Sequence, residues 1–286
     1  MDICRVQAVN TAIVIGASSG IAKAIVTELA DNAEIEQIIT ISQKELVFNV
    51  SNNIHHHISC DYTMNGSGNS ASNDANENIA RVCLALSSIK GHITKVFICN
   101  GRLHSLNNQM SVHTHNPQTS KSPENQQIEP STVLSPEKRL EDITPASMLS
   151  VFQSNTLVPM MWLQHLVKLV NGKQACVISV LSARVGSISE NQLGGWYSYR
   201  ASKAALNMLI KTSAIEYARR AKNTKLIAFH PGTTDTELSK PFQANVPEGK
   251  LFTADFVAQQ LLTIHQGIEF NNQAEFLDWQ GKTVQW

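Results

Sequence analysis

The sequence predicts an α/β fold: a doubly wound, mainly parallel sheet of seven strands with helices on both faces. Short apolar runs alternate along the chain with longer segments of helical character, which is typical of successive β-α-β units. The chain has 286 residues, of which 42% are hydrophobic, so it can build the core of one large α/β domain or of two small ones. In such a fold, right-handed crossovers bring ligands to the carboxyl ends of the strands.

The expected strands are short apolar segments bounded by polar or glycine-rich residues. They cover residues 11–16, 36–42, 53–60, 95–101, 175–182, 225–232 and 274–279. Helical segments are expected between most of them, over residues 20–31, 74–90, 145–170, 199–221 and 253–266.

Two polar segments interrupt this alternation, at residues 62–78 and 104–132. The second is long, rich in Asn, Gln, Ser and Pro, and has almost no apolar periodicity, so it cannot bury enough surface to offset its ordering entropy. Because the alternation resumes after it without a restart, we expect residues 1–286 to form a single domain with a flexible insertion at 104–132. That insertion is either a lid or a tolerated excursion.

Composition argues against several classes of function. Lys plus Arg equals Asp plus Glu, 23 each, which gives no support for nucleic acid or an anionic membrane as a partner. Five widely spaced cysteines, no secretory signal and no long apolar run indicate a reduced, cytoplasmic protein. Three adjacent histidines at 55–57 lie on an expected strand, where neighbouring side chains point to opposite faces, so no metal site is expected.

A glycine-rich turn follows the first expected strand. The segment "AIVIGASSGIAKAIVTEL" passes from strand to helix through Gly16, Ser18, Ser19 and Gly20, with Ile21 opening the helix. Glycines permit the tight turn and a close approach of a ligand to the backbone, and a helix N-terminus favours a pyrophosphate. This position after a strand and before a helix predicts a Rossmann-type dinucleotide site, although such a turn alone is also common in other proteins.

The segment "YSYRASKAALNML" raises the possibility of catalysis. On a helix, Tyr199 and Lys203 are one turn apart and present a phenol beside an ammonium, whereas Tyr197 has Ala201 at the equivalent spacing. Taken alone, the pair would more often be an ordinary surface pair of a helix.

Together, these segments resemble the short-chain dehydrogenase/reductase family. The glycine turn has its G-x-x-x-G-x-G pattern with Ala22 in the third glycine place, "YRASK" its Y-x-x-x-K, and "FHPGTTDTEL" its P-G-x-x-x-T. "MLSVFQSNTLVPMMWLQHL" resembles the helix that carries its catalytic asparagine, here Asn155. The stretches "SPEKRLEDITP", "LSARVGSISENQLGGWYSYRASKAALNM" and "GKLFT" resemble the C-factor-like and sniffer-type carbonyl reductases within the family.

The resemblance implies a hydride transfer between nicotinamide and a carbonyl or alcohol substrate. Tyr199 would be the general acid/base, with its pKa lowered by the neighbouring ammonium and by the nicotinamide cation. Lys203 would also hold the nicotinamide ribose, Ser182 would bind the substrate carbonyl, and Asn155 would hold a water that relays protons to Lys203.

The chain departs from the family at two places. The family's N-A-G is Cys99-Asn100-Gly101 here, so only Gly101 matches in place. The family's serine stands three residues before a glycine, where this chain has Ala183. Ser182, four before Gly186, is our candidate, with Ser179 and Ser187 as substitutes.

The expected cofactor is NADP, or alternatively NAD. NAD-preferring sites place an acid at the end of the second strand, where this chain has Ile41-Ser42-Gln43-Lys44, and Lys44 could attract a 2′-phosphate. The resemblance adds further cofactor contacts, and the full set is Gly16, Ser18, Ser19, Gly20, Ile21, Ser42, Lys44, Asp61, Tyr62, Asn100, Gly101, Tyr199, Lys203, Pro231, Gly232, Thr234 and Thr236.

The sequence therefore predicts an NAD(P)(H)-dependent carbonyl reductase or alcohol dehydrogenase that acts on a small molecule. The family resemblance also implies a homodimer or homotetramer. Two alternatives remain: a C-factor-like signalling or regulatory protein that binds NAD(P) with little or no catalysis, and a nucleotide-binding protein with feeble activity.

Overall fold

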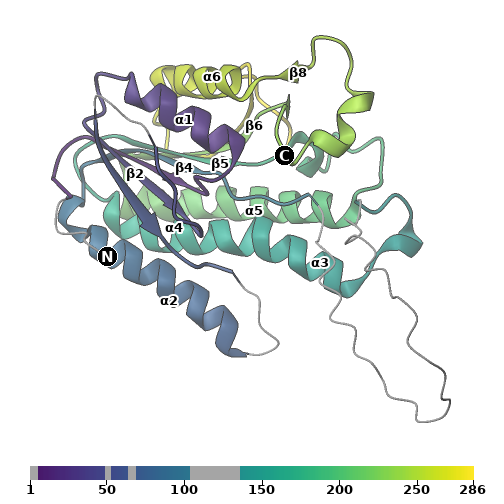
Figure 1. Cartoon of the computed structure of the whole chain (residues 1–286), viewed down its shortest axis with the longest axis horizontal. Helices are drawn as coiled ribbons and strands as arrows, with labels where there is room; N and C mark the ends of the chain where they lie inside the picture. The colour runs from purple at the N-terminus through teal and green to yellow at the C-terminus, as the bar shows by residue number, and fades with distance from the viewer. Residues whose placement is uncertain (1–5, 49–52, 64–68, 104–135) are drawn as a thin grey trace, which may run out of the picture.

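The fold is built around one seven-stranded sheet (Figure 1). The computed structural model describes residues 6–48, 53–63, 69–103 and 136–286. The strands are β1 (Thr11–Ile15), β2 (Gln37–Ser42), β3 (Ile54–Ser59), β4 (Ile93–Ile98), β5 (Cys176–Leu181), β6 (Thr224–His230) and β9 (Glu275–Asp278). The predicted fold class is confirmed, and the sheet is wholly rather than mainly parallel.

The strand order is β3-β2-β1-β4-β5-β6-β9, so the order reverses between β1 and β4. Side chains of β1 and β2 are buried on both faces, which explains their continuous apolar runs. At such a reversal the connections leave to opposite sides and open a crevice at the carboxyl ends of the strands. The loops after β1 and β4 lie there.

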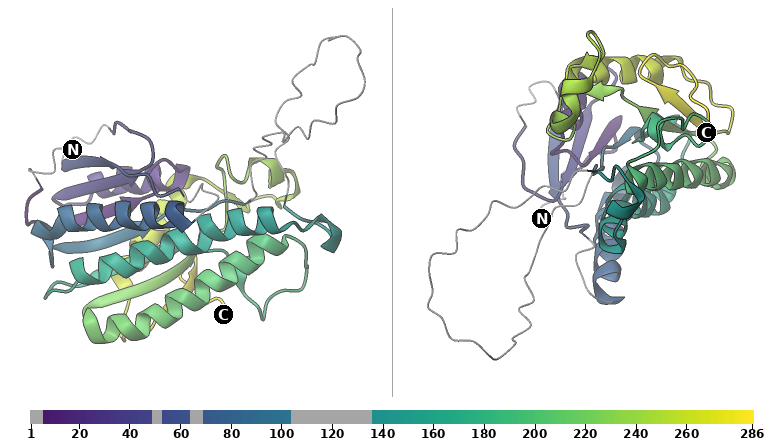
Figure 2. Two further views of the ribbon diagram at one scale, coloured as in Figure 1. Left: turned by 90° about the horizontal axis from the view of Figure 1, so that it is seen from below. Right: turned by 90° about the vertical axis from the view of Figure 1, so that its right-hand side faces the viewer.

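Helices cover both faces of the sheet, and the views in Figure 2 show it between the two helical layers. On one side, α1 (Gly20–Ala30) packs against α6 (Ala254–Gly267). On the other lie α2 (Asn69–Ala85), α4 (Val158–Leu169) and α5 (Tyr197–Arg220). Each layer has its own hydrophobic cluster, with Trp162 fully buried in the second.

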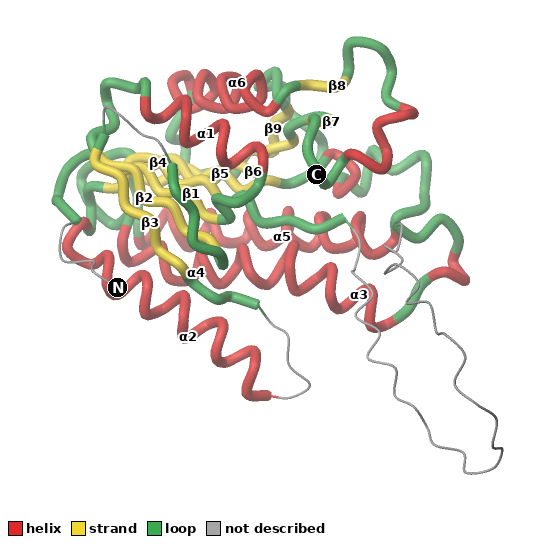
Figure 3. The backbone as a smooth tube through the Cα atoms, viewed as in Figure 1, coloured by secondary structure: helices red, strands yellow, loops and turns green. Residues whose placement is uncertain are grey.

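The helix expected over 145–170 is interrupted. It consists of α3 (Pro145–Phe152), a π-helical turn (Gln153–Leu157) and α4, drawn as one nearly continuous rod in Figure 3. A π turn inserts one extra residue per turn and is often found at functional sites. Here it contains Asn155.

Shorter elements complete the described chain. Strands β7 (Thr233–Thr234) and β8 (Leu251–Phe252) pair with each other, and 3₁₀ turns cover Leu86–Ile89, Leu140–Asp142, Arg184–Gly186 and Lys240–Asn245. The expected insertion at 104–132 lies outside the described residues, so its flexibility and the single-domain organisation stay predictions.

No helix in the described ranges is long and apolar enough to cross a membrane. Cys60, Cys83, Cys99 and Cys176 are buried free thiols. The predicted cytoplasmic location is not tested by these observations.

Candidate functional site

The glycine turn packs tightly between the ends of two neighbouring strands. Gly16 has a φ of +75°, and a Cβ there would lie 3.1 Å from the backbone nitrogen of Asn100. The N–H groups of Gly16 and Ala17 both donate to the Ile41 carbonyl, at 2.9 and 3.1 Å. Only glycine combines this backbone conformation with this close approach.

Helix α1 begins directly after the turn. The Ser19 hydroxyl caps it by accepting a hydrogen bond from the Ala22 N–H at 3.3 Å. Its first turn carries no acidic side chain, so the positive end of the helix is available to an anion. A Cβ at Gly20 would lie 3.1 Å from Cγ2 of Thr236, which brings the segment after β6 over the start of the helix.

A cleft opens beside this turn. Its walls come from the glycine turn, the ends of β2, β3 and β4, and the α3 side of the π turn. They consist of Gly16, Ser18, Ser19, Gln43, Tyr62, Thr63, Cys99, Asn100, Gly101, Arg102, Ser150, Gln153, Ser154 and Val158. Six predicted cofactor contacts are among them: Gly16, Ser18, Ser19, Tyr62, Asn100 and Gly101.

Several wall residues were not predicted from the sequence. Arg102 is the one wall residue with a charged side chain, and its guanidinium donates to the Ser150 hydroxyl at 3.2 Å. Ser150, Gln153 and Ser154 follow i, i+3, i+4 spacing just before Asn155. This polar stripe on a predicted helix is the signal that could have identified them.

At the end of β2, the structure places Gln43 rather than Ser42 on the cleft wall. Ser42 is fully buried, and its hydroxyl donates to the Lys44 carbonyl at 2.5 Å. Lys44 has an exposed side chain. Asp61, expected to contact the cofactor, accepts hydrogen bonds from the Thr63 N–H and hydroxyl, so it closes a local turn.

Asn155 joins the end of β4 to α5. Its Oδ1 accepts from the Arg102 N–H at 2.6 Å, and its Nδ2 donates to the Arg102 carbonyl at 2.7 Å and to the Ser202 hydroxyl at 3.0 Å. Because this fully buried amide uses both its donor hydrogens and its oxygen on the protein, it fixes the backbone next to Gly101.

Lys203 lies at the same junction. A Cβ at Gly101 would be 3.7 Å from Lys203 Nζ and 3.9 Å from Asn155 Oδ1. Nζ donates to the Leu181 carbonyl at 2.8 Å, and the side chain is only 2% exposed. The structure thus brings Lys203 and Asn155 together at the end of β4.

Tyr199 is half-buried, one turn before Lys203, with its ring centroid 6.0 Å from Nζ. The expected lowering of its pKa is not found: burial raises the pKa of Tyr199 to about 12. Burial also lowers the pKa of Lys203 to about 7, because a charged group is disfavoured away from water. Near neutral pH, Lys203 is therefore only partly charged and attracts a phenolate less than a full ammonium would.

Ser182 points into the protein. It is 4% exposed, and its hydroxyl donates to Oδ1 of Asn207 on α5 at 2.5 Å. Ala183, the next residue, has extended backbone and is 8% exposed. Of the substitutes, Ser179 bonds to His265 at 2.7 Å and Ser187 accepts from the Glu190 N–H.

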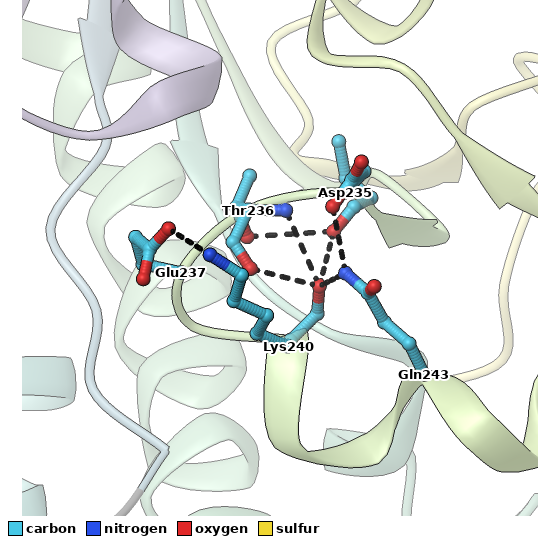
Figure 4. A network of polar contacts seen from close by, with 7 residues as sticks. Asp235, Thr236, Glu237, Lys240 and Gln243 are labelled. Atoms are coloured by element: carbon cyan, nitrogen blue, oxygen red, sulfur yellow. Dashed lines mark hydrogen bonds and ion pairs between the residues drawn. The ribbon is translucent and has the colours of Figure 1, made fainter.

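The segment after β6 is held by its own polar network (Figure 4). The Gln243 amide donates to Asp235 at 2.8 Å and to the Ser239 hydroxyl at 2.9 Å, and Lys240 pairs with Glu237 at 2.8 Å. In the preceding turn, Gly232 has a φ of +73°, and a Cβ there would lie 2.6 Å from the Phe252 ring.

Eleven of the predicted cofactor contacts do not line the cleft. They are Gly20, Ile21, Ser42, Lys44, Asp61, Tyr199, Lys203, Pro231, Gly232, Thr234 and Thr236. Most of them lie beside it, in α1, in α5 or in the segment after β6. In the described part of the chain, no group of three or more His, Cys, Asp or Glu side chains could hold a metal ion.

A parallel Rossmann-type sheet, a glycine turn at the strand reversal and a Tyr-Lys pair on α5 together define a dinucleotide-binding oxidoreductase. The short chain dehydrogenase family model matches residues 131–247. Over this part of the chain, which carries Asn155 and the Tyr199-Lys203 pair, the protein is similar to the short-chain dehydrogenases that its motifs predicted.

Named relatives match about half of the chain. C-signal of Myxococcus xanthus is 28% identical over 147 residues, which cover 51% of this chain and 83% of that protein. A 1-hydroxy-2-glutathionyl-2-methyl-3-butene dehydrogenase of Rhodococcus is 30% identical over 132 residues, or 46% of this chain. That match spans only about half of the relative, 55% of its length.

Solved structures agree in fold over nearly the whole chain. An NADPH-bound carbonyl reductase from chicken fatty liver has a TM-score of 0.69 at 18% identity and covers 98% of this chain and 100% of that one. Carbonyl reductase Sniffer of D. melanogaster has a TM-score of 0.69 at 17% identity, covering 97% and 100%.

Proposed function

We propose that the protein is an NADP(H)-dependent carbonyl reductase or alcohol dehydrogenase with Tyr199 as its general acid/base. The observation that carries the proposal is the convergence of Lys203, Asn155 and the end of β4 around Gly101, beside a cleft that begins at the glycine turn. A small-molecule carbonyl or alcohol is the proposed substrate, and a homodimer or homotetramer remains the expected assembly.

The residues of the cleft suit a dinucleotide. Gly16 leaves room where a Cβ would meet Asn100, and α1 offers its N-terminus to a pyrophosphate. Asn100 Oδ1 is buried and accepts no hydrogen bond from any described residue, so it can accept one from a ligand. NADP is favoured over NAD because Gln43 and Lys44, at the end of β2, place no carboxylate against a 2′-phosphate.

Bound nicotinamide would supply or accept the hydride, and the protein would place the substrate and move the proton. In the reductive direction, the carbonyl carbon gains the hydride and the oxygen takes a proton from the Tyr199 hydroxyl. Because its pKa is about 12, Tyr199 is protonated at neutral pH, which suits proton donation better than proton removal. The Asn155 side chain would hold the backbone at Arg102, so any relayed water would bind elsewhere on the π turn.

Ser182 is not assigned a catalytic role in this proposal. Its hydroxyl has one hydrogen, which is donated to Asn207. To bind a substrate carbonyl, Ser182 would have to release Asn207 Oδ1, and the Asn207 amide would have to turn so that Nδ2, which is buried and has no partner among the described residues, donates to Ser182 instead. From the sequence, both Tyr199 and Ser182 were expected to donate a hydrogen bond to the substrate carbonyl. We propose that Tyr199 alone is the donor.

The same observation favours a second candidate function. If the family's serine place is filled by Ala183, catalysis could be weak, and the chain could be a cofactor-binding regulatory protein. Its similarity to C-signal is consistent with this reading.

The deciding experiment follows NADPH absorbance with a panel of carbonyl compounds, comparing the wild type with Tyr199→Phe and, as a matched control, Tyr197→Phe. We expect Tyr199→Phe to lower turnover by roughly 10²-fold or more, because it removes the transferable proton. The dissociation constant of NADPH should change little in either variant. Full activity of Tyr199→Phe would refute the role of Tyr199, and NADPH binding without turnover of any substrate would support the regulatory alternative.

A further inference from the structure

The first turn of α5 begins on an unusual backbone. Gly194, Gly195 and Trp196 have φ values of +63°, +64° and +53°, three left-handed residues in succession. Trp196 occupies the N-cap position, and its side chain makes no capping hydrogen bond. The first N–H groups of a helix have no partner within the helix, so a buried helix start needs an acceptor from elsewhere.

Glu137 supplies that acceptor from a segment 61 residues away in the sequence. One carboxylate oxygen, Oε2, accepts from the Ser198 N–H at 3.2 Å, and the other, Oε1, accepts from the Ser198 hydroxyl. The Glu137 carbonyl accepts from the Trp196 N–H at 2.5 Å. Glu137 is therefore bonded to α5 by both its side chain and its main chain.

Burying the Glu137 carboxylate costs free energy unless new interactions compensate for its lost hydration. Glu137 is only 6% exposed, and no lysine, arginine or histidine in the described part of the chain forms an ion pair with it. Its compensation comes from the two Ser198 bonds and from the positive end of α5. A leucine would fill the same place without a buried charge, but it has no oxygen to accept from either donor.

The bonds act next to the proposed proton donor. Ser198 immediately precedes Tyr199, so holding the Ser198 N–H and hydroxyl fixes the turn from which the phenol projects. The Trp196 ring meets the Tyr199 ring edge-on, with centroids 6.3 Å apart, and lies 5.3 Å from Phe242. Glu137 thus sets the helix start and, through the Trp196 N–H, the aromatic neighbour of Tyr199.

We propose that Glu137 is a positioning residue for Tyr199, which it orients by capping α5 at Ser198. This inference rests on the proposed function for its effect on turnover, whereas the capping itself can be tested without any substrate. The carboxylate does not touch the reacting atoms. It removes freedom from the turn that presents the phenol, and small displacements of a catalytic group are costly for rate.

The test compares three variants. Glu137→Ala removes both acceptors. Glu137→Gln keeps an oxygen for the Ser198 N–H and offers an amide to the Ser198 hydroxyl. Glu141→Ala, at an exposed acid in the same segment, is the matched control. Two measurements are made on the full-length protein: steady-state reduction of a carbonyl substrate by NADPH, and amide hydrogen exchange of residues 197–203.

We expect Glu137→Ala to lower kcat by about 10- to 100-fold, while KM for NADPH changes by no more than about threefold. Glu137→Gln should recover kcat to within about fivefold of the wild type. Amides at the start of α5 should exchange faster in Glu137→Ala, and at the wild-type rate in Glu137→Gln and Glu141→Ala. If Glu137→Ala does not fold, Ser198→Ala, which removes the hydroxyl bond alone, should give a smaller loss of kcat in the same direction.

The outcomes separate the two proposals. Faster exchange with unchanged kcat would show that Glu137 caps the helix without positioning Tyr199, and would overturn the inference. Unchanged exchange would overturn it as well. An equal fall in kcat for Glu137→Gln and Glu137→Ala would overturn the capping explanation. If the wild type turns over no substrate, the proposed function fails, and an unprotected helix start in Glu137→Ala would then support the capping half alone.

Discussion

Replacing Lys203 with methionine should stabilise the protein while it abolishes activity. Lys203 is 2% exposed, and burial lowers its pKa from 10.5 to about 7. The unfolded chain keeps the lysine in water, so between pH 7 and 10.5 it binds a proton that the folded protein has lost. The unfolding free energy therefore rises with pH through this window, and the buried lysine destabilises the wild type most at pH 7 and below.

The size of the effect follows from the shift. Lowering the lysine pKa from 10.5 to about 7 corresponds to roughly 4–5 kcal/mol at pH 7, since each pKa unit is worth about 1.4 kcal/mol. Methionine also gives up the hydrogen bond from Nζ to the Leu181 carbonyl, a loss of about 1–1.5 kcal/mol. The net gain for Lys203→Met is at most about 3–4 kcal/mol at pH 7, and it falls below about 1 kcal/mol at pH 9.

Urea unfolding followed by tryptophan fluorescence measures this directly, at pH 7 and at pH 9. At each pH, the unfolding free energy of the wild type is subtracted from that of the variant. The informative quantity is how much this difference changes from pH 7 to pH 9. Packing effects of the substitution cancel in it. Lys222→Met, at an exposed lysine just beyond α5, is the matched control and should give the same difference at both pH values. A Lys203→Met difference that is equal at pH 7 and pH 9 would refute the burial argument.

Three further changes test the site. Gly186→Ala would place a Cβ 2.7 Å from the Lys203 Cβ, so it should lower the unfolding free energy by about 1–3 kcal/mol and reduce turnover, as thermal melts and kinetics would show. Lys44→Ala should weaken NADPH binding by about tenfold, with NADH binding unchanged, when dissociation constants are measured by fluorescence at one ionic strength. Ala183→Ser restores a hydroxyl at the family's serine place and should raise kcat several-fold, whereas Ser182→Ala should leave kcat within about threefold of the wild type.

Each of these has an outcome that contradicts it. Normal melting and turnover of Gly186→Ala would mean that α5 does not pack on the turn after β5 as described. An equal loss of NADPH and NADH binding in Lys44→Ala would remove the argument for NADP. A collapse of kcat in Ser182→Ala, with the fold intact by circular dichroism, would return the carbonyl-binding role to Ser182.

The sequence predicted the strands well because most of them are buried on both faces. A continuous apolar run bounded by turn residues is then the full signal, and β1, β2 and β5 carry it. The π turn at Asn155 was not predictable in the same way. Apolar periodicity continues through residues 145–170, so nothing in the pattern marks the extra residue.

Errors at the site arise where a strand ends. A side chain's direction alternates along a strand, so the last residue of β2 and the next one point to opposite sides. Ser42 continues the buried pattern of its strand, and Gln43 reaches the cleft. At the end of β5, Ser182 likewise faces the interior, where its hydroxyl bonds to Asn207. Sequence motifs locate the end of such a strand, but they do not tell which of two successive residues points toward the cleft.

The protonation of the Tyr199-Lys203 pair depends on burial, which the spacing of the two residues does not reveal. In water, an ammonium beside a phenol would favour the phenolate, and the sequence predicted a lowered tyrosine pKa from that ammonium and from the nicotinamide cation together. Both side chains instead lie in a region where charge is disfavoured, so the pKa of Tyr199 rises to about 12 and that of Lys203 falls to about 7. The neutral phenol is the proton-donating form. On the proposed function, this is the form that carbonyl reduction requires, whereas alcohol oxidation requires the phenolate as proton acceptor, which the positive charge of an oxidised nicotinamide would stabilise.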